Sequence, residues 1–370
     1  MLRRLIGLGI VGIAFGAVGQ SGDFMRDAEL VIGAFSEIHP GLVRYASEAE
    51  MVAAADSLRA VASGDQDAGE FYLAVQKYLA TIRCEHTEAE LPKGLRSQLA
   101  ATMLPVDFEY VPDTNGEFRA IVAGVAEGVQ GVSEGDELLA VNGHSMGDIY
   151  AKAEPYIAVD GFTDHTKTSI FAGTDDIGLT TFDVLFPLLF GDSRNYVLDV
   201  AAPIGEPRRV MAGGVDEATS VAMRGQAGQT NFSDEGAVQW RILDERAAGL
   251  WVNTFVNYRT PVDADAVFAE VFAAINAIGA ERLVMDFRGV GGGSDDVQGS
   301  LLRHLITEPI TVGGPARVRT YEFDTYREHL STWSEGVFDL PAQLFTQDGE
   351  FSIVDSSVAG GASTLEPAEH

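Results

Sequence analysis

The sequence predicts an α+β protein of several domains: a helical N-terminal domain, a β-rich domain and an α/β domain. Up to about residue 104, apolar residues recur at the three- and four-residue spacing of amphipathic helices. Short alternating strands follow, and after residue 236 strands alternate with helices, which is typical of a parallel sheet with helical crossovers. The expected boundaries are 20–104 for the helical domain, 105–212 for the β-rich domain, 213–236 for a linker and 237–370 for the α/β domain.

Three helices are expected in the helical domain, over residues 25–36, 48–62 and 67–82. A His-Pro-Gly cluster at 39–41 stops the first helix. Ser47, with Glu50 three residues later, forms a capping-box pattern at the start of the second.

Five strands are expected in the β-rich domain, and one of them ends in an Asn-Gly turn at 142–143. The residues from 162 to 190 mix Gly, Thr, Asp and aromatic residues and predict no definite element. The expected strands cover residues 106–111, 118–125, 135–144, 196–202 and 208–212.

The third domain is expected to run strand, helix, strand, glycine-rich loop and helix, over residues 248–255, 263–278, 282–287, 289–294 and 295–306. Three consecutive glycines, Gly291, Gly292 and Gly293, let backbone N–H groups approach a ligand at a helix N-terminus. Such a loop can stabilise a phosphate, a carboxylate or a tetrahedral oxyanion. The last 60 or so residues predict little regular structure, and the tail from 355 to 370 is expected to be a loop.

Composition and the N-terminus bound the possible partners and the location. The chain carries 25 basic and 55 acidic residues, a net charge of −30, which repels nucleic acid and anionic membranes. Two arginines precede an apolar run from Leu5 to Val18, so residues 1–19 are predicted to be a signal peptide cleaved before Gln20, or otherwise an uncleaved anchor. The protein is therefore expected to be exported, periplasmic or secreted, with no membrane span after cleavage. Cys84 is the single cysteine, so an internal disulfide is excluded.

Three segments together resemble the tail-specific (C-terminal processing) and tricorn-type serine peptidases. They are Ile-Arg-Cys-Glu-His-Thr at 82–87, Gly-Asp-Glu-Leu-Leu-Ala-Val-Asn-Gly at 135–143 and Leu-Val-Met-Asp-Phe-Arg-Gly at 283–289. The resemblance implies a PDZ-like domain followed by a crotonase-like (ClpP/crotonase-type) α/β catalytic domain. It also implies peptide or protein substrates and a mechanism without a metal or cofactor. A glycine-flanked apolar loop of the kind that captures C-terminal carboxylates is not evident near 118–125.

The resemblance assigns roles to residues of the glycine loop and to one histidine. Backbone amides of Gly291, Gly292 or Gly293 would form part of an oxyanion hole. Arg288 would fix the loop or bind a substrate carboxylate, although an ion pair with Asp286 is an equal alternative. His86 lies where tricorn-type members carry their general base, but it can also be a solvated surface residue.

Two other readings of the segment around His86 are less favoured. A nucleophilic pair of Cys84 and His86 is disfavoured because side chains two residues apart rarely align for proton transfer. A metal site formed by Cys84, His86 and Glu88 is disfavoured because no second ligand cluster accompanies them.

A nucleophilic serine is not found. Four serines near the end of the chain are expected to lie in loops: Ser352, Ser356, Ser357 and Ser363. The favoured function is thus an exported serine-type peptidase whose catalytic serine lies beyond residue 370, so that this chain alone is inactive. The alternative is a non-catalytic periplasmic protein that binds peptides in the same cleft. A phosphate-binding loop is disfavoured because no Lys-Ser/Thr follows the glycines. The sequence specifies no oligomeric state.

Overall fold

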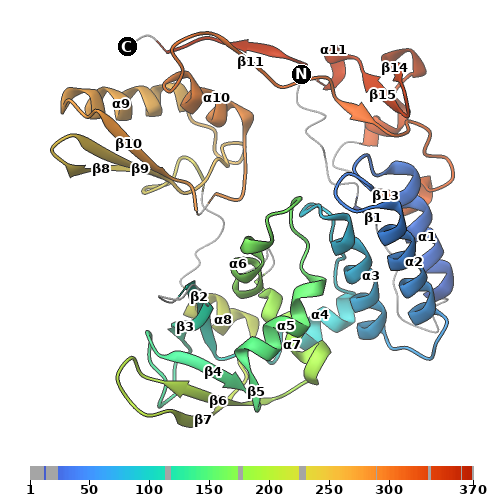
Figure 1. Ribbon diagram of the computed structural model, residues 1–370, viewed down its shortest axis with the longest axis vertical. Coiled ribbons are helices and arrows are strands. Elements are labelled where there is room, and N and C mark those ends of the chain that lie inside the picture. The colour runs from blue at the N-terminus through green and yellow to red at the C-terminus, as the bar shows by residue number, and fades with distance from the viewer. Residues whose placement is uncertain are drawn as a thin grey trace. The chain divides into compact units, whose positions relative to one another are not determined.

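The computed structural model describes residues 12–13, 24–112, 118–173, 178–224, 231–288, 290–331, 335–359 and 361–368. The chain divides into two compact units, and each unit is built from two separate segments (Figure 1). Unit 1 contains Met1–Gln226 and Arg317–Val358, and unit 2 contains Ala227–Ala316 and Ala359–His370.

The N-terminal part of unit 1 is helical, and the three expected helices are present. The helices are α1 (Phe24–Ile38), α2 (Glu48–Ala62), α3 (Ala68–Ile82) and α4 (Lys93–Leu99). The capping box at Ser47 is confirmed, since its side chain accepts from the Glu50 amide while the Glu50 carboxylate accepts from the Ser47 amide. Buried side chains such as Val31, Leu58 and Leu79 form one apolar core between α1, α2 and α3.

The second part of unit 1 is a six-stranded antiparallel sheet. Its strands are β2 (Val106–Pro112), β3 (Phe118–Val125), β4 (Glu137–Val141), β5 (His144–Ser145), β6 (Asn195–Ala201) and β7 (Arg208–Gly213). The predicted Asn-Gly turn joins β4 to β5, with φ of 52° at Asn142 and 83° at Gly143, the left-handed values that this turn requires.

Helices fill the region between β5 and β6, part of which has no predicted element, and a further helix follows β7. They are α5 (Met146–Ala153), η1 (Glu154–Tyr156), η2 (Asp164–Thr166), α6 (Lys167–Ala172), α7 (Thr181–Phe190) and α8 (Glu217–Met223). Three aromatic residues of this region, Phe171, Phe182 and Phe186, are fully buried in the core that the helices share with the sheet.

The expected linker over 213–236 is wrong in part because α8 lies inside it. Asp216 caps this helix by accepting the Thr219 amide, and Ser220 is fully buried. Arg224, at the end of α8, forms ion pairs with Asp107 and Asp183, which fastens the helix to the rest of unit 1. Residues 225–230 of the expected linker lie outside the described residues.

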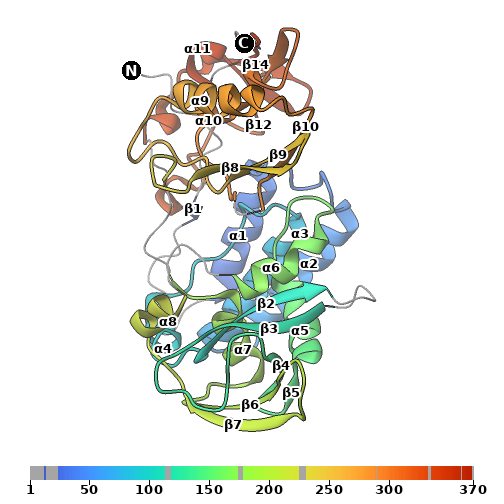
Figure 2. The same ribbon diagram turned by 90° about the vertical axis from the view of Figure 1, so that its left-hand side faces the viewer.

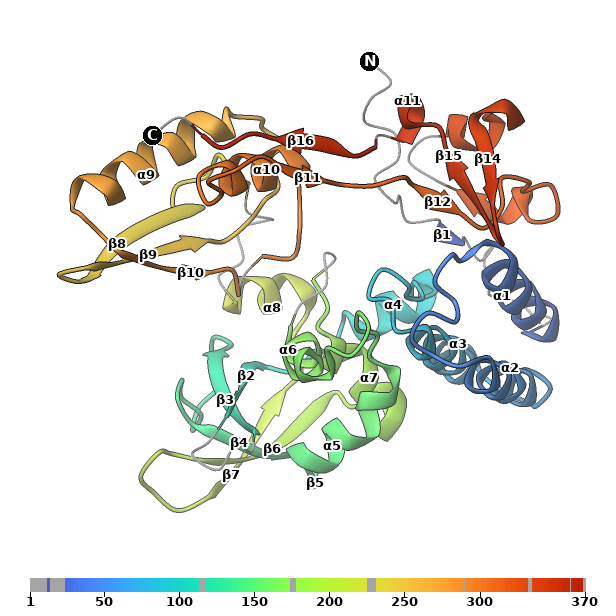
Figure 3. The ribbon, with the colours of Figure 1, turned by 45° about the horizontal axis from the view of Figure 1, so that its top comes forward.

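The segment Arg317–Val358 belongs to unit 1, so the predicted domain over 237–370 spans both units (Figure 3). This segment packs on α1, which lies about 290 residues earlier in the sequence. Tyr326 and Leu330 are buried against Ala34 of α1, and the Tyr326 hydroxyl donates to Glu37 at 2.9 Å. Its elements are β12 (Arg317–Val318), η3 (Arg327–His329), β13 (Leu330–Ser331), η4 (Glu335–Asp339), η5 (Ala342–Leu344), β14 (Phe345–Asp348), β15 (Phe351–Val354) and α11 (Ser356–Ala359).

The predicted signal peptide lies outside the described residues except for β1 (Gly12–Ile13), which pairs antiparallel with β13. Among the helices that the structure describes, none combines the length and the apolar character of a membrane span.

Unit 2 is a small α/β arrangement. Its strands β8 (Val238–Asp244), β9 (Ala247–Val252) and β10 (Arg282–Asp286) form a sheet in the order β10-β9-β8, with β9 and β10 parallel as predicted. Helices α9 (Ala264–Ala277) and α10 (Asp295–Arg303) lie on one face of this sheet (Figure 2), where Leu250, Phe268 and Leu301 are buried together. Strand β8 was not expected from the sequence.

The C-terminal tail is not the loop that the sequence predicts. Strand β16 (Ser363–Leu365) pairs antiparallel with β11 (Ile310–Val312), as Figure 3 shows, and the Ala368 amide donates to the Arg303 carbonyl at 2.7 Å. The pairing partner lies about fifty residues earlier, so the local sequence carried no signal of it.

Candidate functional site

The glycine loop connects β10 to α10 and adopts a backbone that side chains disfavour. Gly292 and Gly293 have φ of 124° and 145°, inside the range that glycine alone occupies freely. A Cβ atom on Gly293 would lie closer to the Phe255 carbonyl than real Cβ atoms approach, and 2.5 Å from the Val256 nitrogen. A Cβ atom on Gly291 would meet nothing within 4 Å. The three glycines therefore have different structural requirements.

Hydrogen bonds fix this loop against the segment that follows β9. The Ser294 amide donates to the Phe255 carbonyl at 2.7 Å, and the Phe255 amide donates to the Gly292 carbonyl at 3.3 Å. The Asn257 amide donates to the Ser294 hydroxyl at 3.1 Å. The Gly292 carbonyl and the Ser294 amide thus hold the loop in place.

The amides of the three glycines take no part in these bonds. Within the described ranges of the chain, no group accepts a hydrogen bond from the backbone N–H of Gly291, Gly292 or Gly293. They immediately precede the N-terminus of α10, whose first turn carries Asp295 and Asp296. These carboxylates repel a free phosphate, whereas a carbonyl oxygen that becomes negative only during a reaction starts neutral. The loop is therefore better suited to an oxyanion than to a phosphate.

Arg288 forms the ion pair that the sequence offered as an alternative to substrate binding. Its guanidinium lies 2.5 Å from the Asp286 carboxylate, and the same carboxylate accepts the Arg288 backbone amide at 3.1 Å. The hydrogen bonds from Arg288 lower the pKa of Asp286 to about 2. The Arg288 side chain is otherwise exposed, so the pair shapes the start of the loop and leaves the guanidinium accessible. Gly289 lies outside the described residues.

His86 lies in the turn that ends α3. Arg83 caps this helix in the left-handed conformation, with φ of 61°, and the Thr87 amide closes the turn by donating to the Cys84 carbonyl at 3.0 Å. Thr87 is buried and its hydroxyl lies 3.3 Å from Nε2 of His39. His86 itself is exposed and belongs to unit 1, whereas the glycine loop belongs to unit 2. Its role as a base stays a prediction.

Asp160 is a carboxylate beside His86 that the sequence analysis did not single out. One potential ligand atom from each of Cys84, His86 and Asp160 lies within 4.8 Å of the other two. In this cluster Asp160 occupies the place that the sequence offered to Glu88. The Glu85 amide donates to Asp160 at 2.8 Å across a separation of 75 residues, so no local pattern could have shown the proximity.

The four serines near the C-terminus lie in regular elements rather than in loops. Ser352 is buried in β15, Ser356 and Ser357 begin α11, and Ser363 lies in β16. Ser357 follows a strand and opens a helix, but β14 and β15 form an antiparallel hairpin, not a parallel crossover sheet. Its hydroxyl donates to Asp355 at 2.5 Å as part of a helix cap. The expectation of loops is wrong because strand pairing organises this segment.

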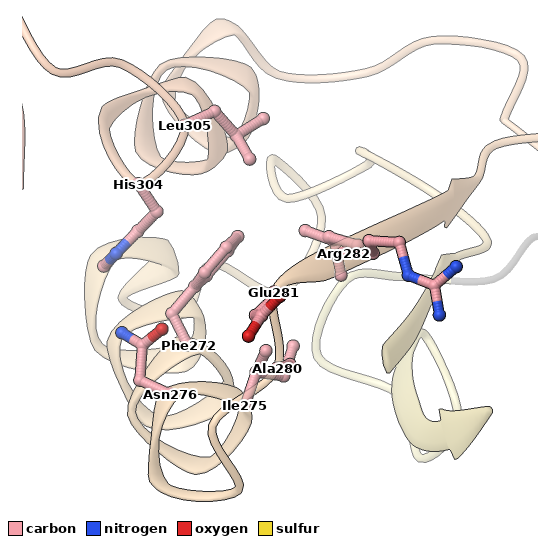
Figure 4. Close-up of a pocket in the computed structure, with 9 residues that line it drawn as sticks. Phe272, Ile275, Asn276, Ala280, Glu281, Arg282, His304 and Leu305 are labelled. Atoms are coloured by element: carbon pink, nitrogen blue, oxygen red, sulfur yellow. The ribbon is translucent and has the colours of Figure 1, made fainter. Parts of the chain in front are cut away.

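Unit 2 also contains a cavity of about 300 Å³ between α9, the start of β10 and the end of α10 (Figure 4). His304 stacks on Phe272 at its wall, with 4.7 Å between the ring centroids, and Glu281 and Arg282 line the side near the strand. This cavity lies at the N-terminal end of β10, whereas the glycine loop follows the C-terminal end. Ligands of parallel α/β sheets bind beyond the carboxyl ends of the strands, so the glycine loop is the better candidate site.

The fold resembles that of the protein CPAF. The structure of mature CPAF complexed with lactacystin superposes with a TM-score of 0.51 at 14% identity, and a CPAF variant with serine replaced by alanine gives 0.52 at 13%. Each comparison covers 80% of this chain and 61% of CPAF. The chain therefore spans about three fifths of the length of these proteins. No protein-family model and no curated protein matches the sequence.

Proposed function

We propose that the chain is the N-terminal and central part of an exported serine peptidase of the tail-specific or tricorn-like type. The antiparallel sheet over residues 105–212 acts as a PDZ-like domain, and unit 2 forms the first part of a crotonase-like catalytic domain. The substrates are peptides or proteins, and the reaction uses neither a metal nor a cofactor. Two observations support the proposal independently: the resemblance of three sequence segments to that family and the similarity of the fold to CPAF.

The geometry of the glycine loop carries the proposal. Hydrolysis of a peptide bond places negative charge on the former carbonyl oxygen, and amides held ready for that charge are worth about 3 kcal/mol each. Here the loop is fixed by its bonds to Phe255, and the amides of Gly291, Gly292 and Gly293 are not consumed by any described group. The loop is thus preorganised and its donors are available, as an oxyanion hole requires.

His86 acts as the general base in this proposal. The buried Thr87 and the closed turn around Cys84 hold the backbone of this residue, while its imidazole stays exposed to a reacting group. An imidazole can take the proton of a serine hydroxyl and return it to the leaving amine.

The nucleophilic serine is proposed to lie in a segment beyond His370. Strand β10 is the edge of its sheet, and its residues Val284 and Met285 are partly or largely exposed, although strands at this position of an α/β sheet are usually covered. A further strand added at this edge would pair with β10 and bring the start of its following loop beside the glycine amides.

The test is to read the gene beyond the codon for His370 and to express its whole reading frame. The product is treated with a fluorophosphonate, which labels an activated serine, and peptide hydrolysis is measured. Covalent labelling at a serine C-terminal to residue 370, together with turnover, is the expected result. The 370-residue chain alone should show neither.

A matched pair of variants separates the roles. His86→Asn in the complete protein should lower kcat by at least about a hundredfold while peptide binding persists, because proton transfer contributes about 10²–10⁴ in rate. His329→Asn, which removes a histidine paired with Glu328 and given no role, should leave kcat unchanged. If the complete protein binds peptides but is never labelled, the peptide-binding protein becomes the better assignment. If turnover is unchanged in His86→Asn, then His86 is not the general base.

A further inference from the structure

The segment that carries His86 is brought next to Asp160 by hydrogen bonds between two segments that are distant in the sequence. The Gly161 amide donates to the Arg83 carbonyl at 3.0 Å, and the Arg83 guanidinium donates back to the Gly161 carbonyl. The Glu85 amide donates to the Asp160 carboxylate at 2.8 Å. These bonds join two segments from different parts of unit 1, and they place Asp160 beside the side chains of Cys84 and His86.

The result is a cluster of three different donor atoms on one small surface. The Cys84 sulfur, an imidazole nitrogen of His86 and a carboxylate oxygen of Asp160 all lie within 4.8 Å of one another. Around a tetrahedral zinc ion, with bonds of about 2.0–2.3 Å, neighbouring ligand atoms are separated by roughly 3.3–3.5 Å. Rotations of exposed side chains that move each atom by about 1 Å therefore suffice to close the cluster around one ion.

The surroundings of the cluster favour a cation. One Asp160 oxygen accepts the Glu85 amide, and a hydrogen bond of this kind orients the carboxylate of a metal ligand. The guanidinium of Arg83, in the same turn, is held by the Gly161 carbonyl and by an ion pair with Asp164 at 2.5 Å. The chain as a whole carries a net charge of −30, which raises the local concentration of divalent cations.

We propose that Cys84, His86 and Asp160 form a binding site for a borderline-soft divalent cation, zinc in the first place. One thiolate, one imidazole and one carboxylate match the donors that zinc accepts, and three protein ligands leave a fourth position for water. The metal displaces the proton of the Cys84 thiol and forms a sulfur–zinc bond, with that proton released to solvent. Zinc has no part in the hydrolysis proposed above.

The site has a regulatory consequence that rests on the proposed function. A zinc ion on the imidazole of His86 occupies the lone pair that takes the serine proton, so zinc reversibly inhibits the complete peptidase. Metal binding itself is independent of this step, since the three ligands all lie in unit 1 of the present chain.

The experiment titrates the 370-residue chain with Co²⁺, a spectroscopic substitute for zinc, after thiol reductants have been removed. A thiolate-to-cobalt charge-transfer band in the near ultraviolet, saturating at one ion per chain and abolished by Zn²⁺, is the expected result. Because Cys84 is the single cysteine, the band can arise only from that residue. Zn²⁺ should also slow alkylation of Cys84 by iodoacetamide.

Variants distinguish a three-ligand site from binding by the thiol alone. His86→Asn and Asp160→Asn should each weaken Co²⁺ binding by at least about tenfold, the loss typical even of partners that only support a ligand. Asn at 160 can still accept the Glu85 amide, so the local fold is kept. Glu88→Gln, outside the cluster, should bind as the unchanged chain does. Absence of the band, or equal affinity in all three variants, overturns the site, and neither result bears on fluorophosphonate labelling of the complete peptidase.

Discussion

The glycine loop allows a graded stability test, because each of its three glycines meets a different constraint. Alanine at Gly291 meets open space and an ordinary φ, so the free energy of unfolding should change by less than about 0.5 kcal/mol. Alanine at Gly292 also meets open space, but φ of 124° should cost about 1–2 kcal/mol. Alanine at Gly293 adds a collision with the Phe255 backbone, so about 2–5 kcal/mol is expected when overpacking of about 1–3 kcal/mol is included.

Urea unfolding followed by tryptophan fluorescence measures these differences in unit 2. Two of the three tryptophans, Trp240 and Trp251, lie on β8 and β9. A Trp333→Phe background leaves them as the sole tryptophans, so selective excitation of tryptophan follows the transition of unit 2 without that of unit 1. The midpoint should fall in the order Gly291→Ala, Gly292→Ala, Gly293→Ala at an unchanged m-value.

The order of the three variants is what can refute the reasoning. If Gly293→Ala unfolds at the same urea concentration as Gly291→Ala, then the close approach to Phe255 does not exist in solution. If Gly291→Ala is the most damaging of the three, then the conformation assigned to the loop is wrong, and the argument for free amides is lost with it.

Three other perturbations test unit 1 and the start of the loop. The Arg224 side chain is 4% exposed, and Arg224→Ala leaves the buried Asp183 carboxylate without its cation. This variant should lower the free energy of unfolding, measured by thermal unfolding, by about 3–5 kcal/mol. Arg246→Ala, at an exposed ion pair, should change the free energy of unfolding by less than about 1 kcal/mol. Arg288→Gln should raise the pKa of Asp286, measured by NMR, from about 2 toward its ordinary 3.8. Because that pKa is depressed in the folded protein, the stabilisation is present above about pH 4 and is lost as the pH falls toward 2. Leu330→Ala, at a buried contact with α1, should cost about 2–5 kcal/mol, and an unchanged melting temperature would show that this contact is not made.

Local signals in the sequence predicted the elements that depend on neighbouring residues. The capping box at Ser47, the Asn-Gly turn at Asn142 and the parallel strands around α9 were all found, since each is encoded within a few positions. Strand β8 was missed although Val238, Trp240 and Ile242 alternate with polar residues, which is the period of a half-buried strand.

Features that depend on distant residues could not be predicted from one sequence. The packing of Tyr326 on α1, the pairing of β16 with β11 and the approach of Asp160 to Cys84 all join segments that no local pattern connects. The position of the glycine loop could be predicted from its composition, whereas no local pattern pointed to Asp160.

The return of residues 317–358 to unit 1 also sets the order in which the molecule can be completed during synthesis. The hydrogen bond between Tyr326 and Glu37 spans 289 residues. At about 5–20 residues per second, translation leaves the side of α1 that carries Ala34 without this cover for roughly 15–60 s. The chain also leaves unit 1 near residue 226 and re-enters it near 317, so all of β8, β9 and β10 emerges in that interval. A nascent chain of this design presents an uncovered helix face to chaperones for most of its elongation.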